Sequence, residues 1–353
     1  MKIRKAIFPA LSILIVLIVC VNQSVKSQSG SAKNKITDTI VNVYAGSYCK
    51  GNYVWGGAMN LAWNDLSKNI IKEKIALKTN DKNAVGIINK LNKPPFTIND
   101  LDGKSYYIKS GYGQKTLDII NKESRKKFPH KSFADLTGPL NDSDIIAYAS
   151  FLKQVYFPIP FTVNETNFLG QKVKGFYAGN EDERDNVKII DYENDDHFII
   201  SLQLKDSSDQ LILAKGYDMT NPAIVVKAIN DNMSEYWRSM SHRDDFEAPK
   251  LNIDQHRDYL ELIQKQFANK GFEKYVIGEM FENIKFTMDE KGAKAENEAE
   301  IRPVAMSISL EPQPKPKHLV LDKPFWVVMQ RKDSKNPYFL LGVNNTELME
   351  KVK

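Results

Sequence analysis

The feature that most constrains the fold is the run "DIIAYASFLKQVYF" at residues 144–157, which is mostly apolar and has no polar face. A strand with apolar side chains on both faces fits the centre of a sheet that is covered on both sides. Between residues 168 and 215, short alternating runs are separated by clusters of Asp, Asn, Gly and Ser, which is typical of antiparallel sheet with tight turns. The chain must therefore build at least one well-covered sheet.

The other patterns alternate irregularly between helix and strand. Helical spacing of apolar residues covers 60–77, 114–128, 223–240 and 257–269, and strand patterns cover 105–113, 282–290, 323–332 and 337–345. This order favours an α+β fold over a doubly wound parallel sheet. With 353 residues, 42% of them hydrophobic, the chain can bury a large core. No linker divides residues 37–353, so we expect one domain, a monomer, preceded by a flexible polar segment at 29–36.

The first 28 residues predict export. Lys2, Arg4 and Lys5 precede the apolar run "IFPALSILIVLIVCV", and a polar stretch follows it. This arrangement is typical of a secretory signal peptide and predicts a secreted or extracytoplasmic protein. Two alternatives stay open: Cys20 as the lipid-bearing residue of a lipoprotein, and an uncleaved N-terminal membrane anchor. Once the segment is removed, Cys49 is the only cysteine, and we interpret it as a small buried side chain.

Charge and motifs exclude several classes of function. The net charge of +5 is modest and the lysines are scattered among acidic residues, so we expect no nucleic-acid partner. Ser47 and Lys50 match S-x-x-K without the other motifs of penicillin-recognising enzymes. The sequence has no G-x-S-x-G nucleophile elbow, no H-E-x-x-H zinc motif, no phosphate-binding Gly-rich loop and no dinucleotide-binding fingerprint. Their absence from the sequence argues against an enzyme, a cofactor or a metal. The "DDH" at 195–197 is interpreted as a solvated turn and "NEDERD" at 180–185 as an exposed loop.

Residues 292–300, "GAKAENEAE", fit either a helix or a strand. Ala, Glu and Lys are good helix formers, yet the segment alternates strictly. One face carries Ala293, Ala295, Asn297 and Ala299, and the other carries Lys294, Glu296, Glu298 and Glu300. As a strand, the segment would have one face that is small except for the polar Asn297, and one charged face.

From residue 245 onward the chain resembles the serpin family. "EAPKLNID" (247–254), "ENIKFTMDEKG" (282–292) and "LDKPFWVVMQRKDSKNPYFLLGVNN" (321–345) resemble three family blocks in the family's order. Upstream, "DIIAYASFLKQVYFPIPF" (144–161) resembles the family's long central strand. The resemblance implies a large central sheet, two smaller sheets with surrounding helices, and an exposed reactive-centre loop at about 292–318.

The resemblance also implies a mechanical function and its residues. Serpin-type inhibitors of serine or cysteine endopeptidases offer the loop as bait and insert it, once cleaved, as an extra strand of the large sheet. The hinge would comprise Glu290, Lys291, Gly292, Ala293, Ala295, Asn297 and Ala299. The reactive bond would join Met306 to Ser307, which suits chymotrypsin- or elastase-like proteases, with Arg302 as the alternative for a trypsin-like one.

The chain departs from the family in the parts that open the sheet. The Ser-rich block is replaced by "NYVWGGAMNLAWNDL" (52–66), and residues 128–144 hardly leave room for the helix that crosses the large sheet. Glu296 and Glu298 interrupt the usual run of small hinge residues. A non-inhibitory serpin-fold protein that binds or carries a ligand is therefore the alternative to an inhibitor.

Overall fold

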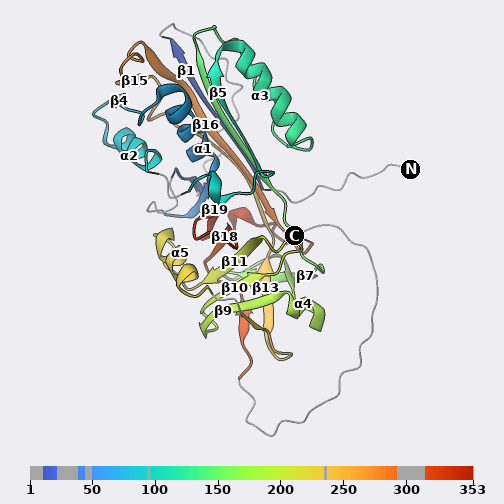
Figure 1. Ribbon diagram of the computed structural model, residues 1–353. Helices are drawn as coiled ribbons and strands as arrows, with labels where there is room; N and C mark the ends of the chain where they lie inside the picture. The colour runs from blue at the N-terminus through green and yellow to red at the C-terminus, as the bar shows by residue number, and fades with distance from the viewer. Residues whose placement is uncertain are drawn as a thin grey trace.

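The computed structural model describes residues 11–21, 39–43, 50–93, 96–233, 237–291 and 315–352, and for 11–21 it describes the backbone. Within these residues the strands form three sheets, of seven, eight and four strands. Helices pack beside and between them (Figure 1). The predicted α+β class with several sheets is confirmed, although the second sheet has eight strands, several of them short.

The seven-stranded sheet contains the longest strands. Its order is β4–β15–β16–β1–β6–β5, and β14 pairs with β16 off this path. The bounds are β1 (Leu11–Val21), β4 (Leu77–Lys78), β5 (Tyr106–Tyr112), β6 (Ile145–Lys153), β14 (Leu251–Asp258), β15 (Gln266–Phe267) and β16 (Tyr275–Met288).

The other two sheets lie in the lower half of the molecule in Figure 1. The eight-stranded sheet has the order β12–β9–β10–β11–β18–β19–β3–β2, and the four-stranded sheet has the order β17–β13–β8–β7. The eight strands are β2 (Thr39–Val41), β3 (Asn52–Gly56), β9 (Val187–Asn194), β10 (His197–Leu202), β11 (Asp209–Lys215), β12 (Arg238–Ser239), β18 (Phe325–Arg331) and β19 (Pro337–Val343). The four are β7 (Thr162–Phe168), β8 (Gln171–Tyr177), β13 (Asp245–Pro249) and β17 (His318–Val320).

The helices cover both faces of β6. On one face Ile145, Ala147 and Ala149 join the main core, where α1 packs; on the other, Ile146 and Tyr148 pack against residues of α3. The prediction of a central strand buried on both sides is thus confirmed. The helices are α1 (Ala58–Asp65) with a π-helical turn (Leu66–Ile71), α2 (Lys82–Leu91), α3 (Gly113–Lys127), α4 (Glu181–Asp185) and α5 (Pro222–Asp231), with 3₁₀ turns at Ile98–Asp100 and Thr346–Leu348.

One predicted helix is wrong. Residues 257–269 continue β14 to Asp258, pass through turns and enter β15. The apolar spacing that suggested a helix arises because Tyr259, Leu262 and Phe267 are all buried from an irregular chain. Backbone pairing with β16, which a local pattern does not reveal, holds Arg257 and Asp258 in the strand.

Three other expectations change in detail. The helix predicted over 60–77 ends at Ile71, because Lys72 adopts a left-handed conformation with φ of 66°. The helix predicted over 223–240 ends at Asp231. Residues 181–185 form the short helix α4 rather than a loop, with Asn180 as its cap and Glu183 buried.

The apolar N-terminal run occupies the middle of the seven-stranded sheet. Strand β1 pairs antiparallel with β16 on one side and with β6 on the other (Figure 1). The sequence sets residues 1–28 apart from the domain, whereas here residues 11–21 form a strand of the seven-stranded sheet. An uninterrupted apolar run suits this position because a central strand is covered on both faces. Its removal on export stays a prediction. Among the described residues, no helix is long and apolar enough to cross a membrane.

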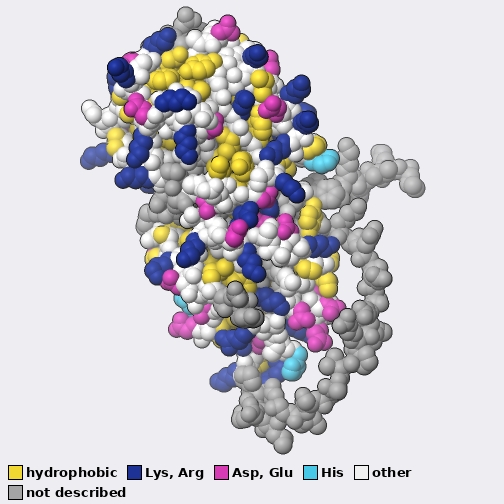
Figure 2. Space-filling model, viewed as in Figure 1, with side chains coloured by type: hydrophobic (Ala, Val, Ile, Leu, Met, Phe, Trp, Pro, Cys, Tyr) yellow, Lys and Arg dark blue, Asp and Glu magenta, His cyan; other side chains and the backbone are white. Residues whose placement is uncertain are grey.

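Charged side chains are spread over the visible surface. Figure 2 shows Lys and Arg interspersed with Asp and Glu on this face, rather than gathered in one stripe. The turn at 195–197 is part of this pattern, because Asp196 lies 2.7 Å from the Lys323 ammonium and 3.1 Å from that of Lys215. Among the described residues, no group of three or more His, Cys, Asp or Glu is placed to hold a metal.

Candidate functional site

The candidate site begins where β16 leaves the seven-stranded sheet. Strand β16 ends at Met288, and the chain returns at β17 in the four-stranded sheet. The segment between them connects two different sheets and contains the predicted reactive-centre loop. Of the predicted hinge residues, Glu290 and Lys291 are described. The others lie outside the described residues, as do the predicted bait residues: Gly292, Ala293, Ala295, Asn297, Ala299, Arg302, Met306 and Ser307.

Glu290 anchors the start of the hinge. Its side chain is nearly buried, and its carboxylate lies 2.5 Å from the Lys250 ammonium. Burial alone would raise the pKa of Glu290, but the bond with Lys250 outweighs it and lowers the pKa. The backbone carbonyl of Glu290 accepts a hydrogen bond from the Phe161 amide at 2.8 Å. Side chain and backbone are therefore both held at the point where the loop departs.

Aromatic packing holds that anchor in place. Phe161 contacts Phe157, Phe176 and Phe246, with ring centroids 5.0, 5.5 and 5.3 Å away. All four rings are buried. Aromatic pairs at these separations add directional attraction to the burial of their area. The departure point of the loop is therefore a fixed part of the core.

The position beside β16 accepts a long antiparallel strand. Ser12–Val21 pair with β16, from Ser12 opposite Lys285 to Val21 opposite Tyr275. Leu11–Val19 pair with β6, from Leu11 opposite Lys153 to Val19 opposite Ile145. A register shift on the β16 side lies between Ile18 and Val19. The gap between β6 and β16 is therefore one strand wide, and β1 fills it.

A buried carboxyl group lies on the inner face of β16 beside this position. Glu282, opposite Ile15 of β1, is fully buried between the buried Met280 and Ile284. The Tyr259 hydroxyl donates a hydrogen bond of 2.6 Å to Glu282 Oε2, and Oε1 has no hydrogen-bond partner among the described residues. Burial raises the pKa of Glu282 to about 8, against the smaller opposing effects of Tyr259 and Arg257. The group is therefore mainly neutral at pH 7.

The sequence analysis overlooked Glu282. Its signal was present in the alternation along β16, where Met280, Glu282, Ile284, Phe286 and Met288 share the buried face. Counting inward positions would have placed one carboxyl group among apolar side chains. We interpreted the whole block by its family resemblance instead, which says nothing of this residue.

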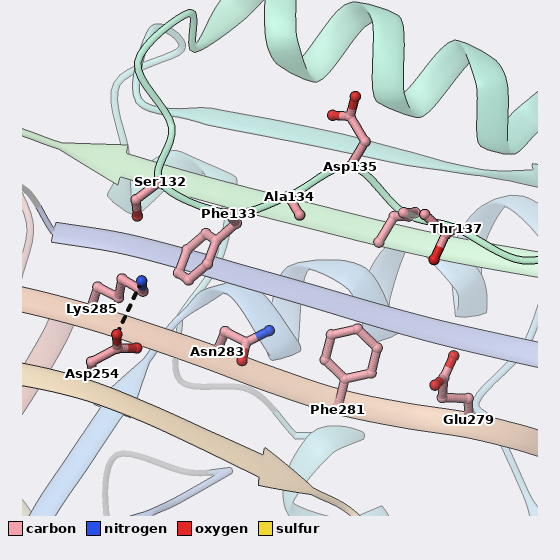
Figure 3. A pocket seen from close by; sticks show the side chains of 11 residues that line it. Ser132, Phe133, Ala134, Asp135, Thr137, Asp254, Glu279, Phe281, Asn283 and Lys285 are labelled. Carbon is pink, nitrogen blue, oxygen red and sulfur yellow. Dashed lines mark ion pairs between the residues drawn. The ribbon is translucent and has the colours of Figure 1, made fainter. Parts of the chain in front are cut away.

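Helix α3 packs on the outer face of β6, whereas a loop rather than a helix lies over the outer face of β16. Residues 129–144 contain no helix, in agreement with the shortness noted in the sequence. A pocket of about 450 Å³ lies between loop residues 132–137 and β16 (Figure 3). Lys285 pairs with Asp254 at 3.0 Å, and its ammonium lies 5.4 Å from the centre of the Phe133 ring. The pocket therefore lies over β16, the strand next to the filled position.

Comparison with known proteins gives structures but no sequence family. No protein-family model matches the sequence. No curated protein matches it either. Among solved structures, a serpin described as highly specific from the insect Tenebrio molitor has 11% identity and a TM-score of 0.48, covering 84% of this chain and 92% of its own.

Two further structures are similar to the same extent. Mouse protein Z-dependent protease inhibitor has 15% identity and a TM-score of 0.49, over 84% of this chain and 91% of its own. Human thyroxine-binding globulin in complex with thyroxine has 13% identity and a TM-score of 0.48, over 83% of this chain and 92% of its own. The three sheets, with one segment of the chain connecting the seven-stranded to the four-stranded sheet, match the serpin-like arrangement that the sequence resemblance implies.

Proposed function

We propose that this protein is an exported serpin-type inhibitor of serine or cysteine endopeptidases. The observation that carries the proposal is the one-strand position between β6 and β16. A chain that leaves the end of β16 and turns back runs antiparallel to β16, which is the direction of the strand now there. The loop that follows Lys291 begins beside this position.

The energetics favour insertion once the position is free and the loop is cut. Each ladder hydrogen bond contributes about 1 kcal/mol net, so a strand the length of β1 can release several kcal/mol. An intact loop is held at both ends, at Glu290 and at β17, and cannot reach along the sheet without breaking one of them. Cleavage after Met306 removes that restraint. The acyl-enzyme formed at the cut would then be carried along the sheet.

The test is incubation of the protein lacking residues 1 to about 28 with a panel of serine and cysteine endopeptidases, scored for adducts that survive denaturing electrophoresis. We expect adducts with chymotrypsin- or elastase-like enzymes, and none with the variant Ala295→Arg, because a long charged side chain would enter the packed interior without a partner. A matched control is Lys294→Arg, on the outward face. Cleavage of the loop by every enzyme without any adduct would contradict inhibition.

A non-inhibitory binding or carrier protein is the second candidate. The observation that favours it is that the insertion position is already filled by a strand of the same chain. A permanently filled sheet behaves as a stable scaffold, and its loop serves as an ordinary surface segment. In that case loop cleavage gives two free ends, no adduct and no rise in the midpoint of thermal unfolding.

A further inference from the structure

The N-terminal strand is paired as an integral part of its sheet. Strand β1 has hydrogen-bonded neighbours on both sides, β16 along Ser12–Val21 and β6 along Leu11–Val19. A central strand with pairing on both sides leaves few backbone groups to be satisfied by water. Occupation of this position is therefore a structural state of the full chain and excludes any other strand from it.

The strand runs in the direction that the cleaved loop would take. Ser12 lies opposite Lys285, close to the end of β16 where the loop departs, and Val21 lies opposite Tyr275 at the far end. A loop that turned back after Lys291 would meet the partners of Ser12 first and those of Val21 last. The two segments therefore compete for the same hydrogen-bonding groups of β6 and β16.

The amino-acid composition favours residues 11–21 over the cleaved loop at the position between β6 and β16. Residues 11–21, "LSILIVLIVCV", are apolar except for Ser12, whereas the predicted inward set of the loop offers three alanines and the polar Asn297. Transfer of large apolar side chains from water into a covered sheet is more favourable than transfer of methyl groups, and transfer of an unpaired amide is unfavourable. The apolar strand therefore binds more strongly than the loop as long as both belong to the same chain.

The cover over the strand leaves it a route of exit. Residues 132–137 lie over this part of the sheet as a loop, and the pocket of about 450 Å³ separates them from β16 (Figure 3). Within the described residues, no helix has to unpack from the outer face between 129 and 144 before the strand can leave. Removal of the N-terminal segment would thus leave a loop, rather than a helix, to move over this part of the sheet.

We propose that residues 11–21 act as an intramolecular plug, which fills the insertion position and keeps the full chain non-inhibitory until the segment leaves. This inference rests on the proposed inhibitory function, because it names what regulates it. The predicted export signal gives the plug a natural trigger. Hydrolysis of the chain within residues 22–28 by a processing peptidase separates the strand from the domain and exposes the position to the loop.

The first arm of the test measures where the segment lies, independently of inhibition. In full-length protein with Cys20→Ser and Cys49→Ser, the variant Ser12→Cys/Lys285→Cys should form a disulfide on mild oxidation, because directly opposed residues of antiparallel strands lie within bonding reach. Ile18→Cys/Glu279→Cys should do the same, since these residues are also opposed. The matched control Ser12→Cys/Glu279→Cys should not crosslink. If the opposed pairs and the control pair crosslink equally, or if no pair crosslinks, the plug is overturned.

The second arm measures whether the plug keeps the loop out. Val16→Pro removes a ladder donor from the middle of β1, and Ala6→Pro places the same residue before the strand. After the loop is cut with elastase, Val16→Pro should gain at least ~5 °C in its unfolding midpoint. The parent and Ala6→Pro should not change. If cleavage raises the unfolding midpoint of the parent, and raises that of the oxidised Ser12→Cys/Lys285→Cys variant by the same amount, the N-terminal strand does not keep the loop out.

The two arms separate the plug from the inhibitory function. One outcome is that the matched pairs crosslink while cleavage fails to raise the unfolding midpoint of Val16→Pro. That result overturns loop insertion and with it the blocking role, and leaves β1 as a structural strand. Absence of specific crosslinking together with a gain in the cleaved parent overturns the plug and supports insertion.

Discussion

The seven-stranded and eight-stranded sheets differ in where they place buried polar groups. In β11 of the eight-stranded sheet, the charged residues Asp209 and Lys215 lie at the two ends, and the middle is mainly apolar. The Lys215 ammonium has a full set of partners, the Asp322 carboxylate at 2.6 Å and the carbonyl oxygens of Val320 at 2.8 Å and Asp195 at 3.0 Å. This sheet gives its buried charges partners, and the buried polar atoms of its strands that lack a partner among the described residues, Gln210 Nε2 and Gln330 Oε1, belong to neutral amides.

The seven-stranded sheet instead buries a carboxyl group in the middle of β16. Glu282 has one hydrogen bond, from Tyr259, and sits beside the position filled by β1. A partly satisfied buried group costs stability, so it is expected where a structure must change. The difference between the sheets is thus an ionisable group left with one hydrogen bond, and its place beside β1 supports our proposal that this sheet exchanges a strand.

The largest expected effect concerns the ion pair that joins the two sheets. Lys153 of β6 pairs with Asp209 of β11 and with Asp102 at 2.8 Å, and both the lysine and Asp209 are buried. Lys153→Met should lower the free energy of unfolding by about 4 kcal/mol, because the Asp209 carboxylate stays buried with two neutral partners, the hydroxyls of Tyr338 and Ser208, and no cation. Urea unfolding measures this effect.

The control for this prediction is an exposed lysine. Lys172 lies 3.9 Å from Glu165, and both side chains are largely exposed. Lys172→Met should change the free energy of unfolding by less than about 0.5 kcal/mol. Equal effects at the two lysines would show that the link between the sheets is unimportant.

The next effect is the dependence of stability on pH through Glu282. Its pKa is about 8 in the folded protein and close to 4.5 when unfolded, so the folded state holds the extra proton between these values. Stability contributed by this group is therefore complete below pH 4.5 and falls as pH rises. Between pH 5 and 7 the loss should be about 2.5 kcal/mol. Urea unfolding at several pH values measures it.

Glu282→Gln isolates this contribution. The amide keeps the shape and the bond with Tyr259 but does not ionise, so the slope of stability against pH should become shallower by that amount. Glu279→Gln, on the outward face of the same strand, is the matched variant and should leave most of the slope in place. An unchanged slope in Glu282→Gln would mean that the buried group does not control stability at the insertion position.

The smallest effect concerns the hinge anchor. Lys250→Met removes the partner of Glu290 and should cost about 1–2 kcal/mol, because the Glu290 carboxylate is nearly buried. First cuts in limited proteolysis should also extend toward Lys291. Lys291→Met, whose ammonium lies 3.5 Å from the same carboxylate and is mostly exposed, should have little effect. If the two variants behave alike, the anchor is not at Lys250.

Sequence patterns predicted the elements that are covered on regular faces. The strand β6, the helix α3 and the alternating strands of 168–215 follow from local periodicity, which depends on burial of one face or of two. Such patterns failed at 257–269, where buried residues at helical spacing come from turns. They also could not distinguish an export signal from a central strand, because both are uninterrupted apolar runs.

The candidate site depends on contacts between residues distant in sequence, which local patterns do not contain. The bond of Glu290 with Lys250 and the position between β6 and β16 both require the sheets to be assembled. The resemblance predicts the hinge, and the structure adds the contacts of Glu290 at its predicted start. Glu282 could have been predicted from the alternation of β16 alone, because it is the only charged residue among the inward positions of that strand.

The central claim is that the position between β6 and β16 receives the cleaved loop once the N-terminal segment is absent. Its most direct measurement is thermal unfolding of the exported protein, lacking residues 1 to about 28, before and after a single cut within the loop. We predict a rise of at least ~5 °C on cleavage, and no rise in Ala295→Arg cut at the same bond. An unchanged midpoint in the cleaved parent would contradict the claim.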